Sequence, residues 1–124
     1  MHRDTRPKRL LVVDDEAQLR AVLTGLLTLE GYVVDEADNG LVALTRMRQV
    51  LPDGMVLDLM MPIMGGRRLV ELMRAEPSLA GIPFILVSAA LGLKDACLAL
   101  SPHACVAKPY DMDVLLDSVR RLVY

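Results

Sequence analysis

The feature that most constrains the fold of this chain is the alternation of short apolar runs with amphipathic stretches. Residues 10–13 form an uninterrupted apolar run that ends in acidic residues, which is typical of a strand buried on both faces of a parallel sheet. In residues 17–29 the apolar side chains return at helical spacing, and Gly31 follows where a helix end favours glycine. The order of strand and helix then repeats, which predicts an α/β fold.

The same patterns predict five strands and five helices. The predicted strands are residues 10–13, 32–37, 54–57, 82–87 and 104–107, and the predicted helices are residues 17–29, 40–50, a stretch through Leu69 and Met73 that ends before Pro77, residues 94–100, and a last helix that Asp111 caps. The helix over 94–100 is apolar on all sides instead of on one face. Alternating strands and helices imply a parallel sheet covered on both faces, with ligands beyond the carboxyl ends of the strands.

Composition limits the classes of function. The length of 124 residues fits a single domain, and 53% hydrophobic residues exclude intrinsic disorder. The net charge of -2 gives no general attraction to phosphate backbones, so we expect no direct contact with nucleic acid. We therefore expect one domain over residues 1–124, with a flexible basic tail over 1–8, as either a complete regulator or a fragment of a longer chain.

The sequence contains no obvious membrane or export segment. The longest uncharged apolar stretch, residues 81–93, is interrupted by Pro83 and Gly92 and is shorter than the roughly 18 to 20 residues that span a bilayer. The basic start is not followed by the pattern of a signal peptide, so we expect a cytoplasmic protein with no membrane contact. Cys97 and Cys105 fit neither a Cys-x-x-Cys pair nor a disulfide framework, and we expect two buried thiols rather than a zinc or redox site.

Polar side chains follow each of the central predicted strands. They are Asp14 and Asp15 after the first strand, Asp58 after the third, Ser88 after the fourth and Lys108 after the fifth. One such residue alone is typical of a turn, but three carboxylates at one edge of a sheet need a cation among them. Oxygen ligands without His or Cys favour Mg2+, which commonly takes one or two carboxylates and a phosphate.

The same group of residues suits the transfer of a phosphoryl group. Asp58 is the best candidate for the nucleophile, because it stands alone at the end of the central strand. Mg2+ and Lys108 would neutralise the phosphoryl oxygens, while Ser88 would donate a hydrogen bond to one of them.

Four short motifs surround these residues. They are Leu11-Val12-Val13-Asp14-Asp15-Glu16, Leu57-Asp58-Leu59-Met60-Met61-Pro62 followed by Met64 and Gly66, Val87-Ser88-Ala89, and Lys108-Pro109. Together they closely resemble the receiver domain of bacterial two-component response regulators, and the resemblance covers residues 8–123. It implies a flavodoxin-like, doubly wound parallel sheet of five strands in the order 2-1-3-4-5, an order that is taken from the family.

The resemblance also implies roles for individual residues. Asp58 would accept a phosphoryl group from a sensor histidine kinase or a phosphotransfer protein. Asp15, Asp58 and the backbone carbonyl of Met60 would bind Mg2+, and Asp14 would act through a water molecule on the metal. The protein would then promote only the phosphorylation and dephosphorylation of its own aspartate, so we do not expect an enzyme.

Two further roles concern the response to phosphorylation. By the same resemblance, Ser88 would bond a phosphoryl oxygen, and Lys108 would pair with its charge ahead of a usually cis bond to Pro109. The phosphoryl group would shift the face formed by the fourth helix, the fifth strand and the fifth helix, and that face would bind a downstream protein.

The chain departs from the family pattern near its C-terminal end. Cys105 stands three residues before Lys108, where the family usually has Tyr or Phe, and this is either a harmless small replacement or a change in signalling. In the apolar fourth helix we predict a dimer or partner contact through Cys97, Leu98 and Leu100. Met60 and Ala90 occupy positions that tend to tune hydrolysis of the acyl phosphate, and their apolar side chains predict slow self-dephosphorylation.

Three alternatives to a phosphorylation-controlled module follow from the same residues. The first is a receiver-like interaction scaffold that does not switch, which Cys105 and the unusual fourth helix favour. The second is a phosphatase of the haloacid-dehalogenase type, but that family has an acidic residue two positions after its nucleophile, where this chain has Met60. The third, a GTPase, lacks its phosphate-binding loop motif.

Overall fold

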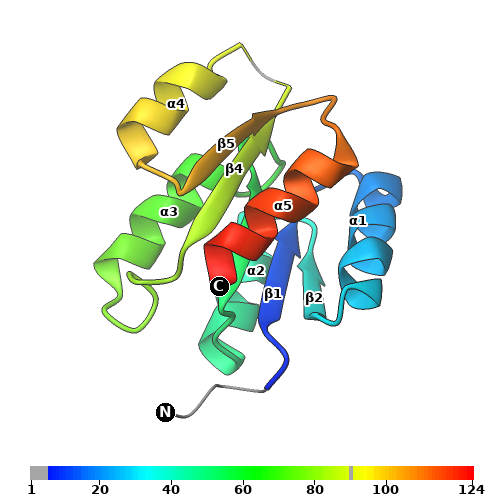
Figure 1. The fold of residues 1–124 in the computed structure, drawn as a ribbon. Helices are drawn as coiled ribbons and strands as arrows, with labels where there is room; N and C mark the ends of the chain where they lie inside the picture. The colour runs from blue at the N-terminus through cyan, green and yellow to red at the C-terminus, as the bar shows by residue number, and fades with distance from the viewer. Residues whose placement is uncertain (1–5, 90) are drawn as a thin grey trace.

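The computed structural model describes residues 6–89 and 91–124, and within them strands and helices alternate as predicted (Figure 1). The strands are β1 (Arg9–Val13), β2 (Val33–Ala37), β3 (Gly54–Asp58), β4 (Phe84–Ser88) and β5 (Ala104–Ala107), and the helices are α1 (Ala17–Leu29), α2 (Gly40–Gln49), α3 (Gly66–Ala75), α4 (Leu93–Leu100) and α5 (Met112–Val123). The predicted bounds differ from these by a few residues at most, chiefly at the start of β4.

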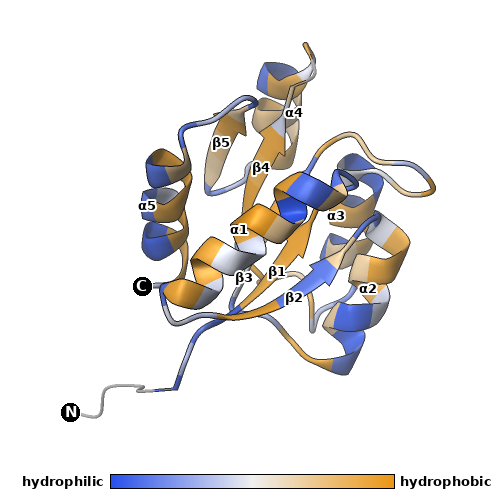
Figure 2. Ribbon diagram, turned by 90° about the vertical axis from the view of Figure 1, so that its right-hand side faces the viewer, coloured by the Kyte–Doolittle hydropathy of each residue, from blue (hydrophilic) through white to orange (hydrophobic). Residues whose placement is uncertain are grey.

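The strands form one parallel sheet in the order β2-β1-β3-β4-β5, which confirms the predicted topology. β2 and β5 lie at its edges, and β5 pairs with β4 alone among the described strands. The central strands are hydrophobic along their length, whereas β2 is partly hydrophilic (Figure 2). In β2, Asp35 and Glu36 form ion pairs with Arg9 and Arg20 at 2.8 and 2.9 Å.

Two hydrophobic cores lie on opposite faces of the sheet, because successive side chains of a strand point to opposite sides. Leu11 and Val13 of β1 contribute to a core beneath α2, α3 and α4. Leu10 and Val12 contribute to the other core, beneath α1 and α5. The layers are therefore helix, sheet and helix, and the loops that follow the strands gather at one edge of the sheet.

The helix-end residues predicted at Gly31 and Asp111 are confirmed, and Asn39 is a further cap. Gly31, after α1, has a φ of 98°, a backbone conformation that glycine adopts without a steric penalty. The Asn39 side chain accepts a hydrogen bond from the N–H of Val42 at the start of α2, and Asp111 accepts one from the N–H of Asp113 at the start of α5.

Helix α4 is less apolar on its outer side than predicted. Leu100 is only 5% exposed and packs into the core with Ala96, so it is not available to a partner. Leu98, by contrast, is 77% exposed. The predicted contact through Cys97, Leu98 and Leu100 is therefore wrong as a set, and Leu98 is the one of the three whose side chain is free to meet a partner.

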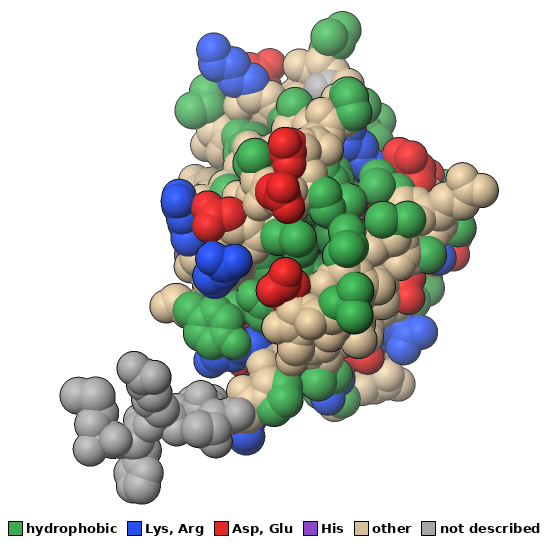
Figure 3. Space-filling view, turned by 45° about the vertical axis from the view of Figure 1, so that its right-hand side comes forward, with side chains coloured by type: hydrophobic (Ala, Val, Ile, Leu, Met, Phe, Trp, Pro, Cys, Tyr) green, Lys and Arg blue, Asp and Glu red, His purple; other side chains and the backbone are tan. Residues whose placement is uncertain are grey.

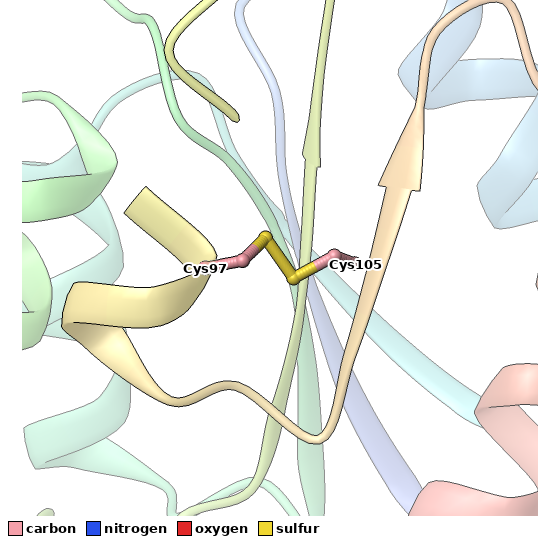
Figure 4. The surroundings of a disulfide bond; sticks show 2 residues. All are labelled: Cys97 and Cys105. Atoms are coloured by element: carbon pink, nitrogen blue, oxygen red, sulfur yellow. A yellow bond between two sulfur atoms is a disulfide. The ribbon is translucent and has the colours of Figure 1, made fainter. Parts of the chain in front are cut away.

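The expectation of two buried thiols is wrong, because Cys97 of α4 and Cys105 of β5 form a disulfide (Figure 4). Their Cα atoms lie 6.3 Å apart. Ala104 and Val106 of β5 pack toward α5, so the side chain of Cys105 points to the opposite face, where α4 lies. Cys105 is exposed and Cys97 is half-buried.

The N-terminal segment is anchored from Lys8 onward. The Lys8 carbonyl accepts a hydrogen bond from the N–H of Val33 at 3.0 Å, and its ammonium lies 5.7 Å from the centre of the Tyr124 ring. Lys8, the last residue of the flexible tail predicted over 1–8, is therefore held in place, and residues 1–5 lie outside the described residues. No described helix has both the length and the apolar character that crossing a membrane requires.

Candidate functional site

The parallel sheet brings four of the predicted site residues to one edge. β1 and β3 are neighbours, so Asp14, directly after β1, stands beside Asp58 at the end of β3. β4 ends at Ser88, whose carbonyl accepts a hydrogen bond from the N–H of Lys108 at 3.0 Å. Asp14, Asp58 and Ser88 are each at most 7% exposed.

Lys108 is the centre of this group. Its ammonium Nζ donates hydrogen bonds to Asp14 Oδ2 and Glu16 Oε1, both at 2.9 Å, and to Asp58 Oδ2 at 3.1 Å. The side chains of Lys108, Asp14 and Asp58 are almost fully buried, whereas that of Glu16 is 60% exposed. The cation therefore neutralises carboxylates that would otherwise be costly to remove from water.

Three carboxylates converge at this edge, as predicted, but the third is Glu16. One oxygen each of Asp14, Glu16 and Asp58 lie within 4.8 Å of one another. Asp14 Oδ1 accepts a hydrogen bond from the N–H of Glu16 at 2.8 Å, which turns the chain after β1. Asp15 is exposed and stands outside this group. Its assignment to the metal stays a prediction, and the signal for Glu16 was its place in the run of three acids.

The environment of Asp58 perturbs its acidity. Burial raises the pKa of the Asp58 carboxyl. The ammonium of Lys108 lowers this pKa and the nearby charge of Asp14 raises it, and the net shift is upward. Its Oδ1 also accepts a hydrogen bond from the N–H of Met60 at 3.3 Å. A buried carboxyl with a perturbed pKa at the end of a strand is a typical functional group.

The charge of Lys108 is secured by its neighbours. Burial alone would lower the pKa of the ammonium, but the hydrogen bonds to Asp14 and Glu16 and the charge of Asp58 outweigh burial and raise it. The side chain is therefore a fixed positive charge beside the Asp58 carboxylate. Such a charge can balance new negative charge that arrives at this carboxylate.

The donor set fits a hard divalent cation. Three carboxylates face one ammonium, which leaves an excess of negative charge that a divalent ion would balance. The donors in this group are all oxygen atoms, and neither His nor Cys is among them. Mg2+ prefers such ligands.

A hollow of about 360 Å3 lies beside Lys108. It is lined by Glu16, Leu19, Ala89, Lys108, Pro109, Tyr110 and Met112. Figure 3, in which the side with α1 and α5 comes forward, shows hydrophobic side chains gathered in the middle of that face with acidic ones among them. The site is thus reached from a surface that is partly apolar.

Gly66 holds the end of β3 in place through close backbone contact. A Cβ atom at this position would lie 2.6 Å from the backbone oxygen of Asp58 and 3.1 Å from the Cα of Leu59. Neither neighbour is a flexible side-chain end, so the backbone itself would have to shift.

We expect Gly66→Ala to lower the free energy of unfolding by about 1 to 3 kcal/mol, because the added methyl group overpacks the loop after β3. Urea denaturation would measure this loss. Gly25→Ala is the matched control, since a methyl group there meets nothing within 4 Å and helix α1 favours alanine. Equal stability of the two variants would contradict the close approach at Gly66.

Residues 10–120 match the family described as the response regulator receiver domain. The chain belongs to this family. Receiver domains are the signalling modules of two-component systems; they take phosphoryl groups from histidine kinases and bind Mg2+ at an acidic site. The cis peptide bond between Lys108 and Pro109 is present, as the family resemblance implied.

The receiver domain is similar to about half the length of longer regulators and to chains of known structure. It is 36% identical over 119 residues to the DNA-binding response regulator MtrA of Mycobacterium tuberculosis. The aligned residues cover 94% of this chain and 51% of MtrA. A crystal structure from Chloroflexus aurantiacus, provisionally described as a response regulator, is 27% identical with a TM-score of 0.88 and covers 95% of this chain and 98% of that chain.

A third similarity concerns the fold alone. The receiver domain of a sensor histidine kinase from Pseudomonas aeruginosa, solved with a magnesium ion in its active-site cleft, is 22% identical with a TM-score of 0.86 over 95% of this chain and 98% of that one. The receiver domain described here spans about half the length of the curated relatives it matches. Since MtrA is named as DNA-binding, the expectation of no nucleic-acid contact has no support from these relatives.

Proposed function

We propose that this receiver domain is a phosphorylation-controlled signalling module in which Asp58 accepts a phosphoryl group from a histidine kinase or a phosphotransfer protein. The observation that carries the proposal is the buried Asp58 carboxylate, bonded to Lys108 within a group of carboxylates at the strand ends of a receiver fold. The domain acts only on its own aspartate, so we propose a signalling module and not an enzyme.

The transfer itself is a displacement at phosphorus. A carboxylate oxygen of Asp58 forms a new O–P bond as the P–N bond to the histidine of the donor breaks, and the leaving imidazole takes a proton from solvent. Lys108 already contacts Asp58 and pairs with the charge that the phosphoryl oxygens bring. Ser88 lies at the end of the neighbouring strand and donates a hydrogen bond to one of these oxygens.

Asp15, Asp58 and the backbone carbonyl of Met60 are the proposed ligands of Mg2+, and Asp14 is proposed to act through a water molecule on the metal. Glu16 also belongs to this acidic group, and its carboxylate could contact the same Mg2+. Bound Mg2+ would supply positive charge against the phosphoryl oxygens in the transition state. The hollow beside Lys108 is lined by Glu16 and Lys108, which both belong to the acidic group.

Incubation with acetyl phosphate, followed by intact-mass measurement, tests the phosphoacceptor chemistry. We expect the protein to gain one phosphoryl group in buffer with Mg2+ and none in buffer with EDTA, because three carboxylates face one ammonium without the metal. No gain in Mg2+ by a folded protein would favour the scaffold function instead. Equal gain in EDTA would contradict the proposed metal site alone.

We further propose that phosphorylation alters the face formed by α4, β5 and α5, which then controls a downstream protein. A specific observation favours the scaffold alternative, however. Cys105 of β5 is bonded to Cys97 of α4, so two elements of this face are joined covalently. The bond restrains movement of α4 relative to β5.

The lifetime of the acyl phosphate is expected to be long, on the order of minutes or more. Met60 is 63% exposed directly beyond the site, and its thioether does not orient a water molecule as a hydrogen-bonding side chain would. Ala90, the other predicted position, lies outside the described residues. We expect Met60→Asn to speed the decay of labelled protein roughly five- to tenfold, the effect of about one hydrogen bond.

Ile63→Asn is the matched control for this measurement, because Ile63 is exposed in the same loop. Its decay should equal that of the wild type. A wild-type lifetime of only seconds would contradict the assignment of slow hydrolysis to these apolar side chains.

A further inference from the structure

The disulfide between Cys97 and Cys105 joins α4 to β5 (Figure 4). β5 carries Cys105 and leads directly into Lys108, which contacts all three carboxylates of the site. α4 carries Cys97 and is joined to Ser88 through the short loop after β4. A covalent bond between α4 and β5 therefore restrains the two elements that are connected along the chain to Ser88 and Lys108.

The noncovalent contacts of α4 with the core come from one side of the helix. Of its eight residues, Ala96 and Leu100 are buried, and Leu93 and Cys97 are half-buried against the core. Gly92, the residue before the helix, provides no side-chain cap. At the other end, Arg74 of α3 donates a hydrogen bond to the carbonyl of Leu100. Because the helix is short and only two of its side chains are fully buried, a covalent link to β5 adds to a limited noncovalent attachment.

The bond is open to attack from solvent. Cys105 is exposed, because it lies on an edge strand with its side chain directed away from the core that α5 covers. Cys97 is half-buried and packs against the core on the α4 side. A disulfide at an exposed residue of an edge strand is more accessible to a small thiol than one enclosed in a core.

We propose that the Cys97–Cys105 disulfide is a redox-sensitive clamp that holds α4 against β5 in the oxidised protein and whose reduction frees α4 to respond to phosphorylation. The second half of this proposal rests on the proposed function of Asp58. The first half concerns the unphosphorylated protein and stands independently of it.

The chemistry of release is a two-electron exchange with a dithiol. A thiolate of the dithiol attacks the sulfur of Cys105, the S–S bond breaks, and Cys97 leaves as a thiolate that takes up a proton. The second thiol of the reductant then attacks the mixed disulfide. Cys105 leaves as a thiol, and the dithiol is oxidised to its own disulfide, so one disulfide is exchanged for another.

Hydrogen exchange of the unphosphorylated protein tests the clamp by itself. We expect the amides of residues 93–100 to exchange about tenfold faster after treatment with dithiothreitol, while those of β1 and β3 keep their rates. The double variant Cys97→Ser/Cys105→Ser should show the fast rate with and without dithiothreitol. Alkylation with iodoacetamide and intact-mass measurement would confirm two new thiols in the reduced wild type.

Two results would overturn the clamp. Unchanged exchange in 93–100 after confirmed reduction would show that noncovalent contacts alone hold α4. Equal acceleration throughout the sheet would show that the bond supports the whole fold instead of one helix.

The same measurement after phosphorylation with acetyl phosphate and Mg2+ tests the coupling. We expect phosphorylation to change exchange in 93–100 in the reduced protein and to leave it unchanged in the oxidised one. If phosphorylation caused equal changes in both forms, the coupling of the clamp to phosphorylation would be overturned and the function of Asp58 would stand. A failure of both forms to gain a phosphoryl group would instead overturn the function of Asp58 and the coupling that rests on it.

Discussion

Protein that carries Asp58→Asn is expected to gain no phosphoryl group from acetyl phosphate and Mg2+ under conditions in which the wild type gains one. An amide lacks the nucleophilic oxygen that forms the acyl phosphate, although it keeps the shape of the side chain. Lys108 retains hydrogen bonds to Asp14 and Glu16. Because Lys108 keeps two carboxylate partners and the amide keeps the shape of the carboxylate, we expect the free energy of unfolding to stay within about 1 kcal/mol of the wild type. Intact mass and urea denaturation measure the two quantities.

Asp95→Asn is the matched control, since Asp95 is an exposed residue of α4 outside the acidic group. It should be phosphorylated like the wild type. A phosphoryl group on the folded Asp58→Asn protein would move the acceptor to another carboxylate of the site, and Asp14 would then be the first residue to replace.

The fold was predictable from sequence because it depends on patterns that local physics enforces. The apolar run of β1 ends in acid, and a strand buried on both faces cannot tolerate polar residues before its end. Gly31 and Asn39 mark helix ends through backbone conformation and capping, which act within a few residues of the chain. The strand order was not worked out from these patterns and came from the family resemblance.

The sequence was sufficient to predict which strand ends form the site. It was not sufficient to predict the directions of the side chains there. Any parallel sheet brings Asp14, Asp58 and Lys108 to the same edge, so their meeting follows from the fold. Which of the acids after β1 turns inward depends on the turn that Asp14 forms with the N–H of Glu16. That turn places Glu16 on Lys108, and Asp15 outside the group.

The disulfide was not predictable, because it depends on where α4 lies over the sheet. Cys97 and Cys105 are separated by 8 positions, and a helix, a turn and an edge strand lie across that interval. The turn contains Ser101 with a φ of 49°, a conformation that non-glycine residues seldom adopt. Spacing alone does not reveal that this turn directs the two side chains toward each other.

Removal of the central cation, in Lys108→Met, is expected to lower the free energy of unfolding by about 2 to 4 kcal/mol in buffer with EDTA. The Lys108 side chain is 9% exposed and contacts Asp14 and Asp58, which are almost as fully buried. Methionine fills a similar volume but leaves both carboxylates without a counterion, and an uncompensated buried charge is strongly destabilising. Urea denaturation with and without EDTA measures the loss.

Mg2+ should restore more stability to Lys108→Met than to the wild type, because the metal is then the sole cation in the acidic group. Lys94→Met is the matched control, since it removes an exposed lysine from α4 and should leave stability within about 0.5 kcal/mol of the wild type, with or without Mg2+. If Lys108→Met were as stable as Lys94→Met in EDTA, the carboxylates would be tolerated without a counterion. No cation would then be needed at this edge of the sheet, and the carboxylates would give no reason for Mg2+ to bind there.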